Sequence, residues 1–132
     1  MSFFIGITLA AGVAVFARRT GLDRDRAYYP TVMIVIAVLY ILFAAIDGST
    51  SILLIEIPIA AGFIALSLAG FKRSLWFVVA ALTAHGLFDI VHPHFVLNRG
   101  VPVFWPQFCS AYDIAAAAIL AWQLKPRQLA CA

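Results

Sequence analysis

Residues 75–94 read LWFVVAALTAHGLFDIVHPH, an apolar run that leads directly into all three histidines of the chain. The segment from Leu75 to about His92 has the length that a helix needs to cross a bilayer, about 17–25 residues. It therefore predicts a membrane-spanning helix whose second half carries His85, Asp89 and His92. This stretch indicates both the medium in which the chain folds and the place where a functional site lies.

The composition of the whole chain indicates the same medium. Of its 132 residues 64% are hydrophobic and 11% are charged, and the mean hydropathy is +1.02. Soluble domains carry about 25% charged residues, and a soluble fold of this size could not bury so much apolar surface. We therefore predict an integral membrane protein whose main partner is the lipid bilayer. Nine Lys and Arg stand against six Asp and Glu, which we attribute to membrane topology and not to nucleic-acid binding.

Short polar breaks divide the chain into five apolar segments, at about residues 2–17, 27–46, 52–71, 75–92 and 108–124. Each is close to the length of a membrane span, and the alternating ten-residue segments of a membrane β-barrel are missing. The sequence thus predicts an all-α bundle of five transmembrane helices that forms a single domain over residues 1–132. Pro93 predicts that the fourth helix ends near His92, because proline restricts the residue before it and has no N–H.

The cations of the short loops set the orientation of such a bundle, since Lys and Arg gather on the cytoplasmic side. The second loop has none and the fourth has only Arg99. The first loop, the third loop and the C-terminal tail contain the others: Arg18, Arg19, Arg24, Arg26, Lys72, Arg73, Lys125 and Arg127. We therefore expect a periplasmic N-terminus and a cytoplasmic C-terminus.

With this orientation, the ionisable residues of the predicted helices all fall in the outer half of the membrane. An ionisable group in lipid costs about 2.5–3.5 kcal/mol, so such groups usually face a cavity or one another. We therefore predict a site open to the outer side, with His85, Asp89, Glu56 and Asp113 as its catalytic candidates. Alternatively, Asp113 forms a structural ion pair with Arg99.

Helical spacing limits which of these residues can share a metal ion. His85 and Asp89 are four residues apart and Asp89 and His92 are three apart, so each pair lies on one face. His85 and His92 are two turns apart, about 10 Å. One ion can therefore bind His85 with Asp89, or His92 with Asp89, but not all three residues. We predict His85, Asp89, His92 and His94 as candidate ligands of a divalent transition metal, Zn or Fe, which such ligands suit.

Two other interpretations of the same residues remain open. Asp89 could orient His85 as a general acid or base, with Glu56 or Asp113 as its counterpart. A polar network could also only hold the helices together. The two cysteines, Cys109 and Cys131, are about 33 Å apart along one helix, and we interpret both as small residues.

The outer connection, residues 93–106, is either a lid or a plain loop. Arg99 in this connection is our candidate for binding a substrate carboxylate or phosphate, and Asp47 is a second candidate for substrate binding. Asp47 and His94 could equally be hydrated residues at the membrane interface.

These observations favour a membrane enzyme, a metal-dependent hydrolase or oxidoreductase that acts on a small or amphipathic molecule. The alternative is a non-enzymatic component that binds or transports a metal or a small solute, and it could form a homo-oligomer.

The order DRDRAYYP, AHGLFDIVH and PVFWPQFCSAYD resembles a group of small bacterial multi-pass membrane proteins over most of the chain. That resemblance implies a bacterial inner-membrane location and no particular activity. Over five residues, His85 to Asp89 is similar to an element of the membrane hydrolases that include the alkaline ceramidases and adiponectin receptors. This second resemblance implies a zinc ion held by histidines and an aspartate, and hydrolysis of a lipid amide.

Overall fold

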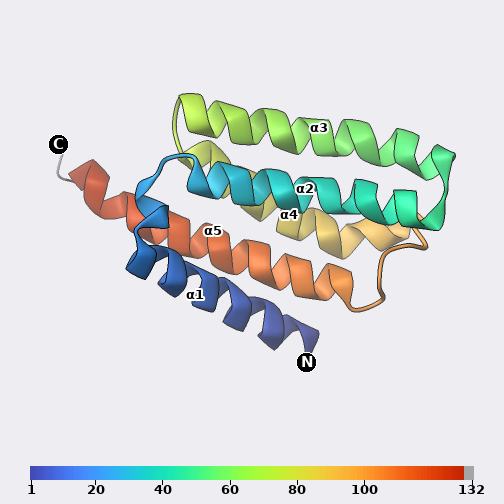
Figure 1. Cartoon of the computed structure of the whole chain (residues 1–132), viewed down its shortest axis with the longest axis horizontal. Helices are drawn as coiled ribbons and strands as arrows, with labels where there is room; N and C mark the ends of the chain where they lie inside the picture. The colour runs from blue at the N-terminus through green and yellow to red at the C-terminus, as the bar shows by residue number, and fades with distance from the viewer. Residues whose placement is uncertain (130–132) are drawn as a thin grey trace.

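A computed structural model describes the backbone of residues 1–129 and the side chains of residues 1–125, and over this range the fold is all-α. Its elements are α1 (Ser2–Thr20), the short 3-10 helix η1 (Leu22–Arg24), α2 (Tyr28–Asp47), α3 (Thr50–Lys72), α4 (Trp76–Phe95) and α5 (Trp105–Leu129). The five long helices run alternately in opposite directions as one elongated bundle (Figure 1). The all-α prediction is confirmed for the described residues.

Four of the described helices are long and apolar enough to cross a membrane: α1, α2, α3 and α4. Helix α5 is not among them, because polar residues such as Asp113 and Gln123 interrupt its apolar sequence. Large apolar side chains cover much of the outer surface of the bundle, including Phe4 at 72% exposure and Leu54 at 69%. This surface suits hydrocarbon better than water.

Helix α4 packs against both α3 and α5, while α1 packs on α5 and α2 packs on α3. The α1–α2 connection, the α3–α4 connection and the end of α5 all lie at one end of the bundle, the left of Figure 1. The other two connections lie at the opposite end, and the N-terminus of α1 points toward that end without reaching it. The cation-rich segments of the sequence are therefore gathered at a single end.

The bounds of α2 and α3 lie within two residues of the sequence-based ranges, whereas four other ends differ by three residues or more: the ends of α1 and α4 and both ends of α5, which stops at Leu129 and not at residue 124. Helix α1 continues past Arg18 and ends at Thr20, where Gly21 adopts a φ of 81° that favours glycine. Helix α5 begins at Trp105, three residues before the predicted start. A proline in the first turn of a helix loses no hydrogen bond, so Pro106 is compatible with this earlier start.

The prediction that α4 ends near His92 was wrong, because the helix continues through Pro93 to Phe95. A proline lacks only its own N–H. The last turn, which contains Pro93, is closed by the Val96 N–H, which bonds the His92 carbonyl at 2.9 Å. His92 therefore keeps its helical position instead of turning away.

The apolar core and the buried polar residues occupy different levels of the bundle. Met33, Val78, Leu82 and Leu120 are fully buried on the side nearer the cation-rich end. The buried charged residues of α4 follow Leu82 along the helix, beginning with His85. Along its long axis, the interior of the bundle is thus apolar in the part nearer the cation-rich end and polar in the part beyond Leu82.

Candidate metal centre

The second half of α4 presents three ionisable side chains to the interior of the bundle. His85, Asp89 and His92 are at most 1% exposed, and their spacing of four and three residues puts them on one helix face. The prediction that these residues face a common interior agrees with their burial. They do not all meet the same partners, because α3 and α5 lie on different sides of α4.

On the α5 side, His85, Asp89, Cys109 and Asp113 form one buried group, here called the α4–α5 cluster. His85 Nδ1 lies 2.8 Å from Asp113 Oδ2 and 3.5 Å from Asp89 Oδ2. One ligand atom from each of the four residues lies within 4.8 Å of all the others. The cluster thus joins two i, i+4 pairs, one from each helix.

Gly86 allows α4 and α5 to approach closely enough to form this cluster. A Cβ atom at position 86 would lie 3.1 Å from Asp113 Cβ, from Ile114 Cγ1 and from the Ser110 carbonyl oxygen. A larger residue would therefore have to push α5 away. The glycine beside His85 sets the distance between the two halves of the cluster.

On the α3 side, Glu56, His92 and Asn98 form a second buried group, here called the Glu56 group. Glu56 Oε1 lies 2.8 Å from His92 Nε2 and accepts a hydrogen bond of 2.9 Å from Asn98 Nδ2. Asn98 comes from the connection between α4 and α5, and its amide also donates to the Tyr40 carbonyl at 3.1 Å. The outer connection therefore supplies a buried member of the site.

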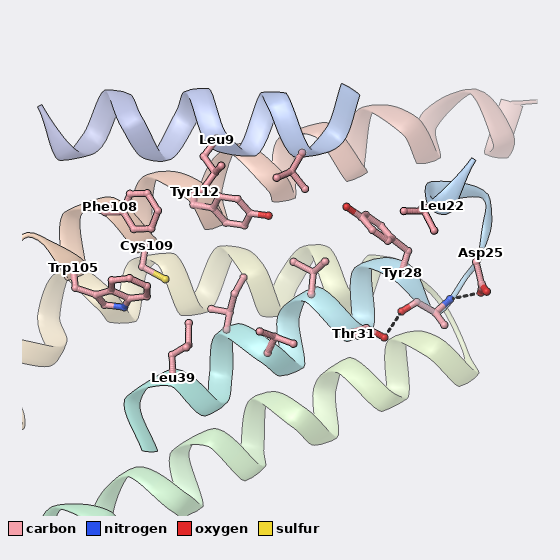
Figure 2. Close-up of a pocket in the computed structure, with 15 residues that line it drawn as sticks. Leu9, Leu22, Asp25, Tyr28, Thr31, Leu39, Trp105, Phe108, Cys109 and Tyr112 are labelled. Atoms are coloured by element: carbon pink, nitrogen blue, oxygen red, sulfur yellow. Dashed lines mark hydrogen bonds between the residues drawn. The ribbon is translucent and has the colours of Figure 1, made fainter. Parts of the chain in front are cut away.

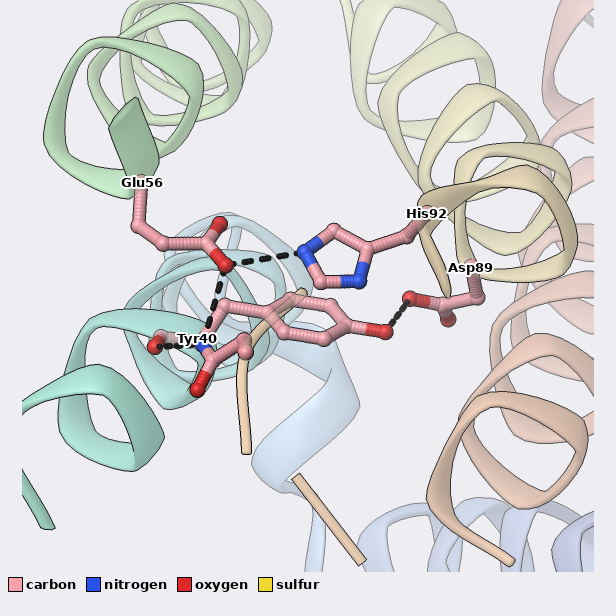
Figure 3. A network of polar contacts seen from close by, with 5 residues as sticks. Tyr40, Glu56, Asp89 and His92 are labelled. Atoms are coloured by element: carbon pink, nitrogen blue, oxygen red, sulfur yellow. Dashed lines mark hydrogen bonds and ion pairs between the residues drawn. The ribbon is translucent and has the colours of Figure 1, made fainter. Parts of the chain in front are cut away.

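Tyr40 of α2 links the two groups (Figure 3). Its hydroxyl donates a hydrogen bond of 2.7 Å to Asp89 Oδ1. Its ring stacks on the His92 imidazole with a centroid distance of 4.0 Å and an interplanar angle of 29°. All four helices from α2 to α5 consequently contribute to one connected interior.

Negative charge exceeds the available positive charge in this interior. Three buried carboxylates, Glu56, Asp89 and Asp113, face two imidazoles. Every Lys and Arg of residues 1–125 is exposed or outside the site. Among the described residues, these three carboxyl groups therefore have one basic partner too few, and a buried charge without a partner is costly.

Each carboxylate of the cluster also has one oxygen without a hydrogen-bond donor in the described part of the chain. These oxygens are Asp89 Oδ2 and Asp113 Oδ1. Buried polar atoms normally find a partner. An added cation would satisfy both oxygens and the charge at once.

The donor set suits such a cation. A tetrahedral zinc ion has bonds of about 2.0–2.3 Å, which separate its ligand atoms by roughly 3.3–3.8 Å. The ligand atoms of the cluster need to move together only slightly from their 4.8 Å limit. Imidazole, thiolate and carboxylate ligands together suit Zn, Fe or Co better than Mg or Ca. The cluster could therefore hold a transition metal.

An apolar groove on the side of the bundle leads to this cluster (Figure 2). It lies between α1 and α2 with α5 as its floor, and its volume is about 550 Å³. Cys109 belongs both to the lining of the groove and to the α4–α5 cluster. A molecule in the groove would lie beside a candidate metal ligand.

The structure does not bring every predicted site residue to this interior. His94, Arg99 and Asp47 are all exposed, so His94 lies outside the cluster and the roles proposed for the other two stay predictions. The described partner of Asp113 is His85 and not Arg99. Cys131, the other cysteine, lies outside the described residues.

Tyr40, Asn98 and Cys109 were not predicted as site residues from the sequence. Tyr40 and Asn98 gave no signal, because a lone tyrosine in an apolar run and an asparagine in a loop are both common. For Cys109 the sequence does contain a signal, because this residue precedes Asp113 by four residues, the same spacing as between His85 and Asp89. Two ligand pairs with this spacing on neighbouring helices could have indicated a four-ligand cluster.

Fold and site together define an all-α bundle with four membrane-length helices and a buried His/Asp/Cys cluster able to hold a metal ion. Comparison of the chain with protein-family models, with curated proteins and with solved structures finds no match. The function is therefore inferred from the site alone.

Proposed function

We propose that this chain is a membrane-embedded metalloprotein that binds a divalent transition metal through His85, Asp89, Cys109 and Asp113. The observation that carries the proposal is a buried four-ligand group in which Asp113 Oδ1 has no hydrogen-bond partner and Asp89 Oδ2 has only a 3.5 Å contact with His85 Nδ1. Glu56 Oε2 and Asn98 Oδ1 of the Glu56 group also have no hydrogen-bond partner among the described residues. The α4–α5 cluster differs from that group because it gathers four potential ligand atoms within 4.8 Å of one another. A divalent cation supplies the missing positive charge and the missing partners.

As an enzyme, the protein would be a metal-dependent hydrolase or oxidoreductase that acts on an amphipathic molecule. A bound metal ion polarises a carbonyl group or activates water. Tyr40 would orient Asp89 through its hydrogen bond, as outer partners of metal ligands usually do. The apolar groove beside Cys109 supports an amphipathic substrate.

A second candidate function is metal binding without catalysis. It is favoured by the closed character of the cluster, since its members are between 0% and 3% exposed and supply four ligands. Structural zinc sites have four protein ligands, whereas catalytic sites keep one position open. Azide added to the cobalt-substituted protein separates the two functions: a changed visible spectrum indicates an open position, and an unchanged one indicates a closed site.

We further propose that all five helices cross a bacterial inner membrane, with the N-terminus outside. Four apolar helices and the gathering of loop cations at one end of the bundle support this orientation. In a Cys131→Ala background, an impermeant thiol reagent added outside should label a cysteine at Val103, which is fully exposed, and not one at Leu22. The opposite labelling pattern would reverse the orientation.

The metal proposal is tested by elemental analysis of the detergent-purified protein after supplementation with zinc, iron or cobalt. We expect close to one metal ion per chain in the wild type and a loss of most of it in Asp113→Asn. Asp47→Asn is the matched control, because this aspartate is exposed, and Glu56→Gln should also keep the metal. A wild-type protein without metal, or equal loss in all three variants, would contradict the proposal.

A further inference from the structure

We propose that the groove between α1 and α2 binds the hydrocarbon chain of a single-chain carboxylic amphiphile, a fatty acid or its monoester, with the polar head beside Cys109 and Trp105. This inference names the substrate class of the proposed metal site and rests on that function for what happens to the head group. The binding itself requires only the groove.

The walls of the groove suit an alkyl chain. Its volume of about 550 Å³ falls within the roughly 300–1,000 Å³ of small-molecule sites. Aliphatic side chains from α1 and α2 line it, among them Leu9, Val13 and Val35, and α5 adds aromatic side chains and Cys109. Because Leu9 is 46% exposed and Val35 is 53% exposed, the groove opens sideways onto the membrane-facing surface. A chain could enter it from lipid without crossing water.

The polar atoms at the two ends of the groove differ, and they define which way an amphiphile lies. At one end, Asp25 accepts a hydrogen bond from the Ala27 N–H, and the Thr31 hydroxyl donates to the Ala27 carbonyl. At the other end, the buried Trp105 Nε1–H has no acceptor in the described part of the chain. Figure 2 shows Trp105 and Cys109 together at this end and Asp25 at the far end.

Charge favours the same orientation. The Trp105 N–H is buried and has no acceptor in the described part of the chain, so a small rotation of the indole would let it donate to a carboxyl or ester oxygen. The Asp25 carboxylate at the other end repels an anionic head. Trp105 also begins α5, and in the orientation proposed above this end of the bundle is the outer one, where an amphiphile of the outer leaflet carries its head group. The head then lies beside Cys109, the residue that the groove shares with the cluster.

The test uses a palmitic acid that carries a diazirine in its chain, added to the purified full-length protein and activated by light. Mass spectrometry should place saturable labelling on the groove residues of α1 and α2, and excess unlabelled palmitate should prevent it. Val13→Trp fills the groove and should lower the labelling roughly tenfold or more, since even modest overpacking has that effect on affinity.

Val15→Trp is the matched control, because Val15 lies on the same helix, is 52% exposed and does not line the groove. On α2, Val35→Phe is a second groove variant and Val38→Phe is its control, because Val35 lines the groove and Val38 does not. A diacyl phospholipid with the same diazirine should label less. Labelling spread over all helices, equal effects in variant and control, or equal labelling by the diacyl lipid would overturn the inference.

The metal content of the same preparations separates this inference from the proposed function. A metal-loaded protein with unsaturable labelling contradicts the groove assignment and leaves the metal site intact. A protein with saturable labelling and no metal contradicts the proposed function and leaves the groove assignment intact.

Discussion

At the scale of single residues, the buried carboxylates of the cluster each use one oxygen and leave the other without a donor. Asp89 accepts from Tyr40 through Oδ1, and Asp113 lies against His85 through Oδ2. The oxygens on the other side, Asp89 Oδ2 and Asp113 Oδ1, have no described donor. Each carboxylate is thus held in place by one oxygen while the other stays available to a ligand.

Tyr40→Phe tests the orienting role of this tyrosine. The variant removes the 2.7 Å hydrogen bond to Asp89 and keeps the ring that stacks on His92. Losing a hydrogen bond to a charged group should cost about 1.5–3 kcal/mol of stability. Metal affinity should fall about 10–100-fold, the usual effect of removing an outer partner of a ligand. Chemical unfolding in detergent and a metal titration measure the two quantities.

Tyr29→Phe is the matched control for that variant. The Tyr29 hydroxyl is also buried, but it has no hydrogen-bond partner in the described part of the chain. Its removal should leave stability and metal affinity close to those of the wild type. If Tyr40→Phe also binds metal normally, Asp89 does not depend on the tyrosine and the orienting role is wrong.

The sequence predicted the ionisable members of the site and missed its neutral members. An ionisable residue inside an apolar segment is conspicuous because its burial is costly, which is why the sequence pointed to His85, Asp89, His92, Glu56 and Asp113, all of them buried in the structure. Their separation into two groups could not be predicted, since it depends on which neighbouring helix each α4 side chain meets. That information lies in the packing and not in the spacing.

At the scale of secondary-structure elements, the pairing of α4 with α5 creates the cluster, and the pairing of α4 with α3 creates the Glu56 group. Apolar run lengths predicted the helices to within a few residues, because crossing a bilayer requires a nearly fixed number of residues. The end of α4 was harder to predict, because a proline in the last turn removes a single hydrogen bond and does not by itself stop a helix.

Gly86→Ala tests whether close approach of α4 and α5 is required. The new Cβ would lie 3.1 Å from two side-chain carbons and a backbone oxygen of α5. Overpacking of this kind costs about 1–3 kcal/mol, which exceeds the gain of roughly 0.5–1 kcal/mol from replacing a helical glycine. We expect a lower unfolding temperature and weaker metal binding.

Gly62→Ala provides the comparison, because a Cβ at that α3 position has no atom within 4 Å. This variant should gain stability by up to about 1 kcal/mol and bind metal normally. Thermal unfolding of both variants in one detergent gives the result. Equal stabilisation of the two would show that Gly86 does not limit the distance between the helices.

At the scale of the whole molecule, charge is distributed in three levels. The cation-rich connections lie at one end of the bundle, an apolar core follows, and the buried acidic interior comes next. The acidic interior has more carboxylates than bases, and every described cation is too exposed to balance it. The α4–α5 cluster lies at this acidic level, and its four ligand side chains could hold a metal ion there.

The most direct test of this account is the absorption spectrum of the cobalt-loaded protein, recorded for the wild type and for Cys109→Ser. Cobalt replaces zinc in mixed nitrogen, oxygen and sulfur sites, and a bound thiolate gives an intense near-ultraviolet charge-transfer band. We predict one cobalt ion per chain with this band in the wild type, and loss of the band in Cys109→Ser. A wild-type protein that binds no cobalt, or a band that persists without Cys109, would contradict the proposed metal centre.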